Sequence, residues 1–192
     1  MTTGVGAAYR RKLSDEDLSF SSRDPHEEQD SGRAPLTSRR RHDLIVGNIA
    51  GELRASLRDV PSGEVYPVGM RVLVQGQRNF APDVTVVCQT PRFEDGTEST
   101  LVNPTILFEV VSETTEAQDR GEKFEVYATI ASLAEYVLVS TRTPRVERFL
   151  RHADGSWTYR AYGMGDVVPL STAGCQLKVD EVYLKAFPKN GI

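Results

Sequence analysis

The chain has few cysteines and no long apolar run. Its 192 residues include two cysteines, Cys88 and Cys175, which stand far apart and form no CxxC pair. This excludes a disulfide framework and a cysteine-based zinc site, and it favours a reducing compartment, so we expect a cytoplasmic protein. No apolar segment approaches the roughly 18 residues that a transmembrane helix needs. The first residues also lack the apolar core of a signal peptide, which argues against secretion.

An excess of positive charge is lacking as well. The chain has 23 Lys and Arg against 27 Asp and Glu, and its formal net charge is −4 at pH 7. An acidic protein of this kind is not a general nucleic-acid binder. Any nucleic acid would therefore have to be bound through a local basic patch or through a metal ion.

The sequence divides into a polar segment and one folded domain. Residues 1–35 are rich in Ser, Asp, Glu and Arg and contain few apolar residues, a composition that is typical of a disordered chain. From residue 36 onward apolar residues recur regularly, and the remaining length suits a single domain. We therefore expect a poorly ordered segment at 1–35 and one domain at 36–192.

Two long helices are predicted in this domain. Apolar residues at every fourth position predict the first one, from Thr37 or Ser38 to about Arg58. A capping box at Thr115 predicts the second one, over residues 116–131. Because the second helix joins two apolar strands through short links, it predicts a right-handed crossover and a parallel strand pair.

The rest of the domain is rich in strand patterns. A hairpin-type turn is predicted at 75–79 and a short helix near 180–187, while 90–103 is expected to be a polar loop. Strands are predicted for residues 65–74, 80–88, 105–111, 135–140, 145–151, 157–162, 167–170 and 176–179. This order indicates an α/β domain of the α+β type around one sheet, with antiparallel strands at its C-terminal end.

Two carboxylates stand inside apolar strands. Asp83 follows Pro82 in the segment 80–88, and Glu109 interrupts the apolar run 105–111. A buried carboxylate is costly unless it is paired or bound to a metal, and two such neighbours repel each other, which lowers the cost of admitting a divalent cation. Hard oxygen ligands favour Mg²⁺ or Mn²⁺, as in phosphodiester-cleaving sites. Taken alone, Asp83 is more often a turn or strand-entry residue.

Lys123 is the third candidate residue. It precedes Tyr127 by one helical turn, which places it at the margin of the face that packs on the sheet. A lysine stem can lie along apolar surface and bring its ammonium group to the sheet edge. There it could orient the attacking water or stabilise charge that develops on a phosphate. The simpler alternative is an ion pair with Asp119, four residues earlier.

Other polar residues near the first helix have a structural and a functional interpretation. His42 precedes Ile45 by three residues, so it lies on the buried face, where a histidine is usually a satisfied core residue. Its functional interpretation is an aid in binding a phosphate or the attacking water. The run Arg39–Arg41 is usually only solvated charge, but it could also bind phosphates.

Short motifs recur in a fixed order along the domain. They are Tyr66-Pro67, Ala81–Val87, Asn103–Thr105, Glu109–Ser112, Asp119–Phe124, Glu135–Val139 and Pro144–Arg148. By its order and spacing this series resembles the Uma-type putative restriction endonuclease family, which belongs to the PD-(D/E)XK nuclease superfamily. The resemblance covers about His42 to Phe187.

The resemblance implies a restriction-endonuclease-like αβββαβ core with a mixed sheet. It implies that Asp83 and Glu109 are the two acids that hold Mg²⁺, or Mn²⁺, with the Val111 main-chain carbonyl as a third ligand. Lys123 on the helix would replace the lysine that the superfamily usually has in the strand, where Val111 stands here. His42 would be a secondary contact.

The function expected from these residues is that of a divalent-metal-dependent endonuclease that hydrolyses phosphodiester bonds in DNA. A homodimer is expected as well, because two active sites suit two strands. One alternative is a catalytically silent protein of the same fold that binds or scaffolds. Another is a hydrolase of a different phosphoester or small substrate, which would need a closed pocket.

Overall fold

The computed structural model describes residues 37–74, 79–94, 96, 98–112 and 119–187. The segment 1–35 lies outside the described residues, so both its predicted disorder and the predicted boundary at residue 36 stay predictions. Most of the predicted turn at 75–79 also lies outside them. Among the described helices, none is long and apolar enough to cross a membrane.

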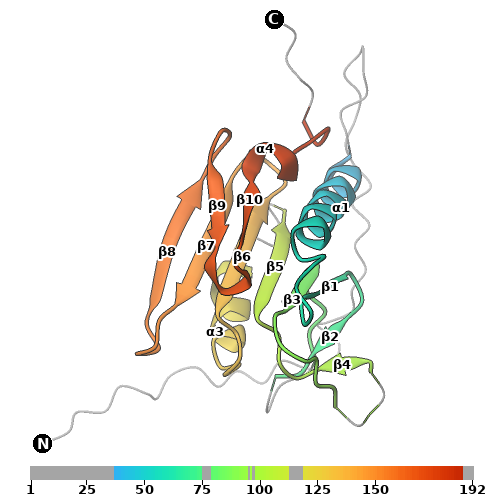
Figure 1. The fold of residues 1–192 in the computed structure, drawn as a ribbon. Coiled ribbons are helices and arrows are strands. Elements are labelled where there is room, and N and C mark those ends of the chain that lie inside the picture. The colour runs from blue at the N-terminus through green and yellow to red at the C-terminus, as the bar shows by residue number, and fades with distance from the viewer. Residues whose placement is uncertain (1–36, 75–78, 95, 97, 113–118, 188–192) are drawn as a thin grey trace, which may run out of the picture. The chain divides into compact units, whose positions relative to one another are not determined.

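A six-stranded mixed sheet forms the centre of the domain (Figure 1). Its strands, in spatial order, are β1 (Glu64–Pro67), β3 (Val84–Val87), β5 (Ile106–Val111), β6 (Glu135–Ser140), β7 (Val146–Arg151) and β8 (Trp157–Tyr162). β5 and β6 are parallel, and every other neighbouring pair in this sheet is antiparallel. The predicted α+β class, the mixed sheet and the parallel pair are confirmed.

Two small sheets accompany the central one. β2 (Arg71–Val72) pairs in parallel with β4 (Thr100–Leu101), and β9 (Val167–Leu170) pairs with β10 (Cys175–Lys178) in antiparallel fashion. β4 lies in the segment 90–103, where the sequence predicted only a loop.

The strand predicted at 65–74 is wrong in its extent. It is divided into β1 and β2, and β1 rather than β2 pairs with β3. A single bridge between Val72 and Phe80 is what remains of the predicted hairpin. The physical reason lies at the break, where Pro67 offers no N–H donor and Gly69 has a φ of +107°, a conformation that few other residues adopt.

Among the described residues, one helix is long and the other helical elements are short. α1 (Ser38–Ser56) begins as predicted, because the Thr37 hydroxyl accepts a hydrogen bond from the Arg40 N–H at 3.2 Å. The predicted second helix ends earlier than expected, since the Thr129 hydroxyl donates to the Val126 carbonyl and competes with the helical pattern. In the part of the chain that the structure describes, the helical elements after α1 are the π-helix η1 (Asp119–Lys123), α3 (Phe124–Tyr127), the 3₁₀ turn η2 (Ser171–Ala173) and α4 (Val179–Val182).

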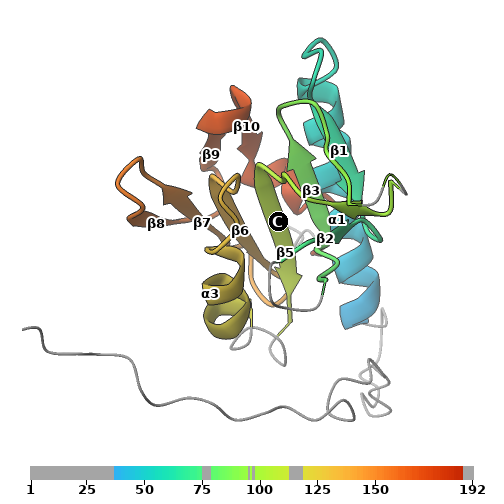
Figure 2. The same ribbon diagram turned by 90° about the horizontal axis from the view of Figure 1, so that it is seen from below.

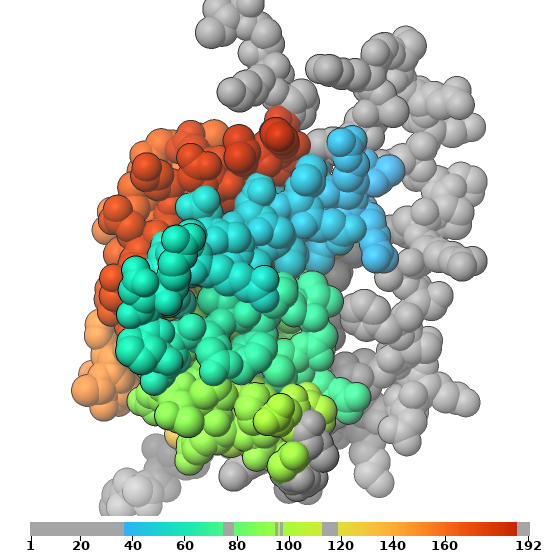
Figure 3. Space-filling model, turned by 45° about the vertical axis from the view of Figure 1, so that its right-hand side comes forward, coloured from blue at the N-terminus to red at the C-terminus, as the bar shows by residue number. Residues whose placement is uncertain are grey.

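The two faces of the central sheet are covered by different elements (Figure 2). α1, β9, β10 and α4 share one apolar core with one face, while α3 and β2 share a second core with the other face. Figure 3 shows α1 crossing its face between the C-terminal segments, in red, and the segment from β1 to β4, in green. Both cysteines are free.

A buried ion pair fastens the small C-terminal sheet to the central one. Arg148 Nε lies 2.6 Å from Glu135 Oε2, and the two residues are 7% and 0% exposed. The other oxygen of Glu135 accepts hydrogen bonds from the Thr172 N–H and hydroxyl, at 2.9 and 2.8 Å. The carboxylate therefore links β6 and β7 to the turn between β9 and β10.

Replacing Arg148 by methionine should leave the Glu135 charge buried without its cation. We expect Arg148→Met to lower the free energy of unfolding by about 3–5 kcal/mol, as is usual when one partner of a buried pair is removed. The matched control is Arg160→Met, because Arg160 is directly opposite Arg148 in the β7–β8 register but is exposed. This control substitution should lower the free energy of unfolding by less than about 1 kcal/mol. Urea unfolding measures the stability of both variants. Equal losses would contradict the conclusion that the buried Arg148–Glu135 pair stabilises the domain.

Candidate active site

Two carboxylates face each other across the pairing of β3 with β5. The antiparallel register pairs Val84 with Phe108, so the next step along both strands brings Asp83 opposite Glu109. Directly opposite side chains share a face, with Cβ atoms about 4.5–5.5 Å apart. Asp83 is fixed there because its Oδ2 accepts a hydrogen bond from the Val110 N–H at 2.7 Å. The structure thus brings the two predicted acids together at one end of this strand pair.

Glu109 is buried in apolar surroundings. It is 4% exposed and shares its face of β5 with Leu107 and Val111, which belong to the core under α3. Burial raises the pKa of Glu109 to about 8; the cation Lys123 limits this rise, while Asp83 adds to it by like-charge repulsion. Burial therefore opposes ionisation of this carboxyl group, while the cation Lys123 favours it.

Lys123 reaches this carboxyl group from the π-helix η1. Its Nζ lies 3.4 Å from Glu109 Oε1 and 2.5 Å from Asp119 Oδ1. Burial alone would lower the pKa of Lys123, but the two carboxylates outweigh burial and raise it. The structure therefore combines both sequence-based interpretations, since Lys123 forms the ion pair with Asp119 and also contacts the candidate site.

Tyr127 holds the second acid from the same helical segment. Its hydroxyl donates a hydrogen bond to Glu109 Oε1 at 2.8 Å, and the residue is fully buried. The ring packs edge-on against Phe80, with 5.5 Å between the centroids. One oxygen of Glu109 thus receives two donors, from Tyr127 and Lys123, which fixes the orientation of the carboxyl group.

His42 contacts the first acid from the N-terminal turn of α1. Its Nε2 lies 3.1 Å from Asp83 Oδ1, and its Nδ1 lies 3.4 Å from Asp43 Oδ1. The hydrogen bond with Asp83 raises the pKa of His42 against the opposing effect of burial. The side chain is 31% exposed, so His42 is not the enclosed core histidine of the structural interpretation.

The Val111 main-chain carbonyl is already engaged. It accepts hydrogen bonds from the Thr141 N–H at 2.9 Å and from the Thr141 hydroxyl at 3.1 Å. Both lone pairs are therefore used at the end of the β5–β6 pairing. This oxygen could join a metal site only by giving up a hydrogen bond to Thr141.

The arginine run before α1 has a structural part. The Arg41 guanidinium donates to the carbonyls of Thr141 and Ala186, at 2.9 and 3.3 Å, and lies over the Phe187 ring. Arg39 is exposed and lies 3.6 Å from Asp43. Arg41 therefore joins α1 to the C-terminal part of the domain, and its predicted phosphate contact would compete with these bonds.

The donor atoms suit a hard divalent cation. Within the described ranges, no three His, Cys, Asp or Glu side chains stand together as a complete metal site. Yet Mg²⁺ commonly takes only one or two protein carboxylates and keeps several waters. The like-charge repulsion that raises the pKa of Glu109 beside Asp83 is what a cation would relieve. The two acids thus fit Mg²⁺ or Mn²⁺.

The sequence did not single out a second charged group on the same face of the sheet. Glu147 Oε2 lies 2.6 Å from an Arg120 nitrogen, and Glu147 Oε1 lies 2.7 Å from an Arg145 nitrogen. Glu147 is 2% exposed although it is a carboxylate within a strand. The signal available in the sequence was the same as for Glu109, a lone acid among residues of a predicted strand, but its arginine neighbours made it look exposed.

Comparisons with known proteins concern the family and the fold of this chain. The model of a family described as "Putative restriction endonuclease" (Uma2) matches residues 18–180. A crystal structure described as that of a "putative nuclease" from Anabaena variabilis has a TM-score of 0.59 at 13% sequence identity, covering 77% of this chain and 82% of that chain. At this identity the likeness concerns the fold alone, and it confirms the predicted fold class.

Two uncharacterized proteins of Synechocystis sp. are similar in sequence. One is 35% identical over 111 residues, which are 58% of this chain and 57% of that protein. The other is 33% identical over 117 residues, which are 60% of this chain and 66% of that protein. The chain therefore spans less than two thirds of the length of either relative.

The buried carboxyl group of Glu109 should make stability depend on pH. Because its pKa is raised from 4.5 to about 8, the folded protein binds a proton that the unfolded chain releases between these values. The free energy of unfolding should therefore fall as pH rises through this window, by at most about 1.4 kcal/mol per pH unit. In Glu109→Gln this contribution should be absent.

Urea unfolding at several pH values in the presence of a chelator measures this effect. His42, whose pKa is also raised, contributes a fall of the same sign in both proteins. The quantity of interest is therefore the difference between the wild type and Glu109→Gln. Parallel stability curves across the window would show that Glu109 is ionised in the folded protein.

Proposed function

The chain belongs to the Uma2 restriction endonuclease family, and on this basis we propose that it hydrolyses phosphodiester bonds in DNA with the help of Mg²⁺ or Mn²⁺. The observation that carries the proposal is the pair of opposed carboxylates, Asp83 and Glu109, with the Lys123 ammonium beside them. Two acids and a cation at one end of a strand pair are the groups that a metal-assisted phosphoryl-transfer site needs.

Asp83 and Glu109 would hold the divalent cation. Bound there, the ion supplies Lewis-acid charge to a phosphate and lowers the pKa of water. A main-chain oxygen could complete the set. Because the N–H and C=O of a strand residue point to the same side, the Val110 carbonyl points toward Asp83, whereas the Val111 carbonyl bonds to Thr141. We therefore favour Val110 over Val111 as the third ligand.

Lys123 acts as a cation in this proposal. Since its neighbours raise its pKa, it stays protonated at neutral pH and is unsuited to be a general base. Its ammonium group can donate a hydrogen bond to a phosphate oxygen and stabilise the negative charge that grows there during attack. Asp119 and Glu109 position the ammonium for this contact.

His42 and Tyr127 act through the two acids. The imidazole hydrogen-bonds to Asp83, and the phenol donates to Glu109. Both are therefore positioning residues, which keep each carboxyl group turned toward the space between them. The expected homodimer remains part of the proposal, because cleavage of both DNA strands needs two sites.

A catalytically silent protein is the second candidate. The observation in its favour is that Lys123 is bound to both Glu109 and Asp119 in the protein alone. An internal ion pair of this kind can persist as a purely structural feature after activity is lost. Measurements of metal binding and of DNA cleavage distinguish the nuclease from the catalytically silent protein.

Metal binding can be measured by calorimetry with Mg²⁺ and Mn²⁺. We expect saturable binding by the wild type that is lost in Asp83→Ala, because one of two carboxylate ligands is removed. The control is Asp59→Ala, since Asp59 is an exposed acid just beyond α1, and it should bind as the wild type does. Equal binding by the Asp83 variant would remove this residue from the site.

Plasmid cleavage tests Lys123. We expect Lys123→Met to slow cleavage by a factor on the order of 10²–10³, as the loss of one charge-stabilising donor usually does. Lys178→Met is the control, because Lys178 is exposed on β10, and it should leave the rate unchanged. If the wild type binds metal but cleaves neither plasmid nor single-stranded DNA, the silent protein becomes the better description.

A further inference from the structure

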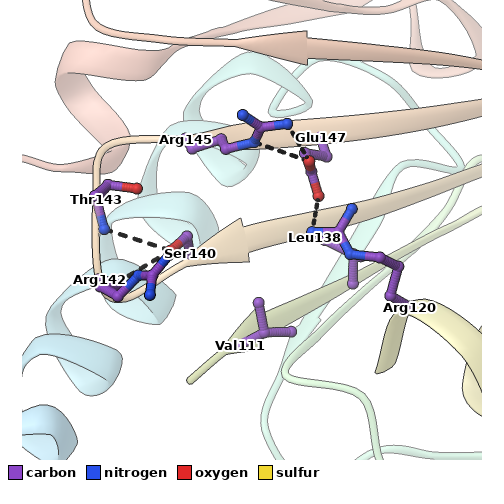
Figure 4. A pocket seen from close by; sticks show the side chains of 8 residues that line it. All are labelled: Val111, Arg120, Leu138, Ser140, Arg142, Thr143, Arg145 and Glu147. Carbon is purple, nitrogen blue, oxygen red and sulfur yellow. Dashed lines mark hydrogen bonds and ion pairs between the residues drawn. The ribbon is translucent and has the colours of Figure 1, made fainter. Parts of the chain in front are cut away.

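A small arginine-lined pocket adjoins the candidate active site. It has a volume of about 240 Å³ and opens where β5 and β6 end. Val111 forms part of its floor, two residues after Glu109. Figure 4 shows Arg120 and Arg145 approaching the carboxylate of Glu147 from two sides.

Glu147 organises the arginine side chains of this pocket. Its Oε2 pairs with Arg120 at 2.6 Å, while its Oε1 accepts from Arg145 Nε at 2.8 Å and from the Tyr159 hydroxyl at 2.6 Å. The Tyr159 hydroxyl also accepts a hydrogen bond from Arg145 at 2.9 Å. A buried carboxylate thus fixes one edge of the Arg145 guanidinium, whose side chain remains 53% exposed.

The pocket and the candidate active site lie in one row across the sheet. Glu109 pairs with Leu138, and Leu138 pairs with Glu147, so the two acids share a face on three adjacent strands. With neighbouring strands about 4.7–4.9 Å apart, their main chains are roughly 10 Å apart. A nucleic-acid strand whose phosphate reaches Glu109 therefore has a nearby phosphate within reach of Arg145.

The lining has the charge and shape for a phosphate. Its charged residues are the arginines Arg120, Arg142 and Arg145 and a single acid, Glu147. Guanidinium groups bind phosphate oxygens through pairs of parallel N–H donors, and a pre-oriented guanidinium loses little entropy on binding. In a chain with a net charge of −4, such a local basic site is what binding to a polyanion requires.

We propose that this pocket binds a backbone phosphate of the substrate strand beside the one that is cleaved, with Arg145 as the main contact. The inference rests on the proposed nuclease function and adds the means by which the strand is positioned. A phosphate contact carries no base information, so it should act alike on every DNA sequence. Its removal should weaken binding and reduce the dependence of binding on salt.

The test is binding of two fluorescently labelled DNA duplexes of different sequence, measured by anisotropy over a range of salt concentrations. The binding buffers contain either a chelator or Ca²⁺. We expect Arg145→Gln to weaken binding of both duplexes on the order of tenfold and to lower the slope of log K against log salt by about one. Arg145→Lys should keep the slope but only part of the affinity, because it retains the charge and loses the planar fork.

Arg160→Gln is the matched control. Arg160 is an exposed arginine on β8, in register with Arg148 on the opposite face of the sheet from Glu147, and we expect wild-type affinity and slope. Thermal unfolding of every variant separates a binding defect from a folding defect. Should Arg145→Gln unfold early, the Arg145→Lys result decides, since retention of the slope with reduced affinity supports the phosphate contact.

Three outcomes would overturn the inference. The first is that Arg145→Gln binds DNA with unchanged affinity and salt slope while the wild type cleaves plasmid. This would show that the pocket does not bind a phosphate, and the nuclease proposal would be unaffected. A loss confined to one of the two duplexes would mean that Arg145 contacts a base. A wild type that neither binds the duplexes in either buffer nor cleaves plasmid would overturn the inference together with the proposed function.

Discussion

The antiparallel register of β3 and β5 is the constraint on which the candidate site depends. Pairing Val84 with Phe108 brings Asp83 opposite Glu109 and lets the Val110 N–H bond to the Asp83 carboxylate. Because side chains alternate along a strand, a slip of one residue would turn Glu109 toward the apolar core under α1. Burial of the apolar side chains of β3 and β5 therefore maintains the register, even though the same burial makes a charge on Glu109 costly. Packing, rather than mutual attraction, holds the two acids together.

The π-helix η1 supplies the charges that balance these acids. Lys123 contacts Glu109 and Asp119, while Arg120, three residues earlier in the same helix, contacts Glu147. One short segment thus serves both carboxylates of the row across the sheet. π-helical turns are often found at functional sites, and here the turn carries one cation to β5 and another to β7. The proposed catalytic and phosphate-binding groups are consequently coupled through η1.

In the proposed site the lysine comes from a helical segment rather than from the strand that carries Glu109. Val111 stands two residues after Glu109, where it is 3% exposed and packs in the core below α3. A charged side chain in that place would be buried, which is costly. Lys123 instead approaches from the helix, with its stem half-buried and its ammonium between two carboxylates. The proposed site thus has a cation beside Glu109 while Val111 keeps the strand apolar.

The sequence by itself determined the features that local pattern encodes. Periodicity, capping and burial predict an N-cap at Thr37 or Ser38, the parallel pairing of 105–111 with 135–140, and Asp83, Glu109 and Lys123 as costly charges. The structure brings these three side chains together, although their roles remain a proposal. Neighbouring residues suffice for such inferences because each depends on contacts within one or two elements.

Only the tertiary structure decided the features that depend on distant partners. The pairing of β1 rather than β2 with β3 and the ion pair of Arg120 with Glu147 both join segments far apart in the chain. In the sequence, Glu147 is one acid between two arginines, which is also the pattern of an exposed strand. Its burial depends on which strands flank β7 and on where η1 crosses the sheet, and no local pattern carries that information.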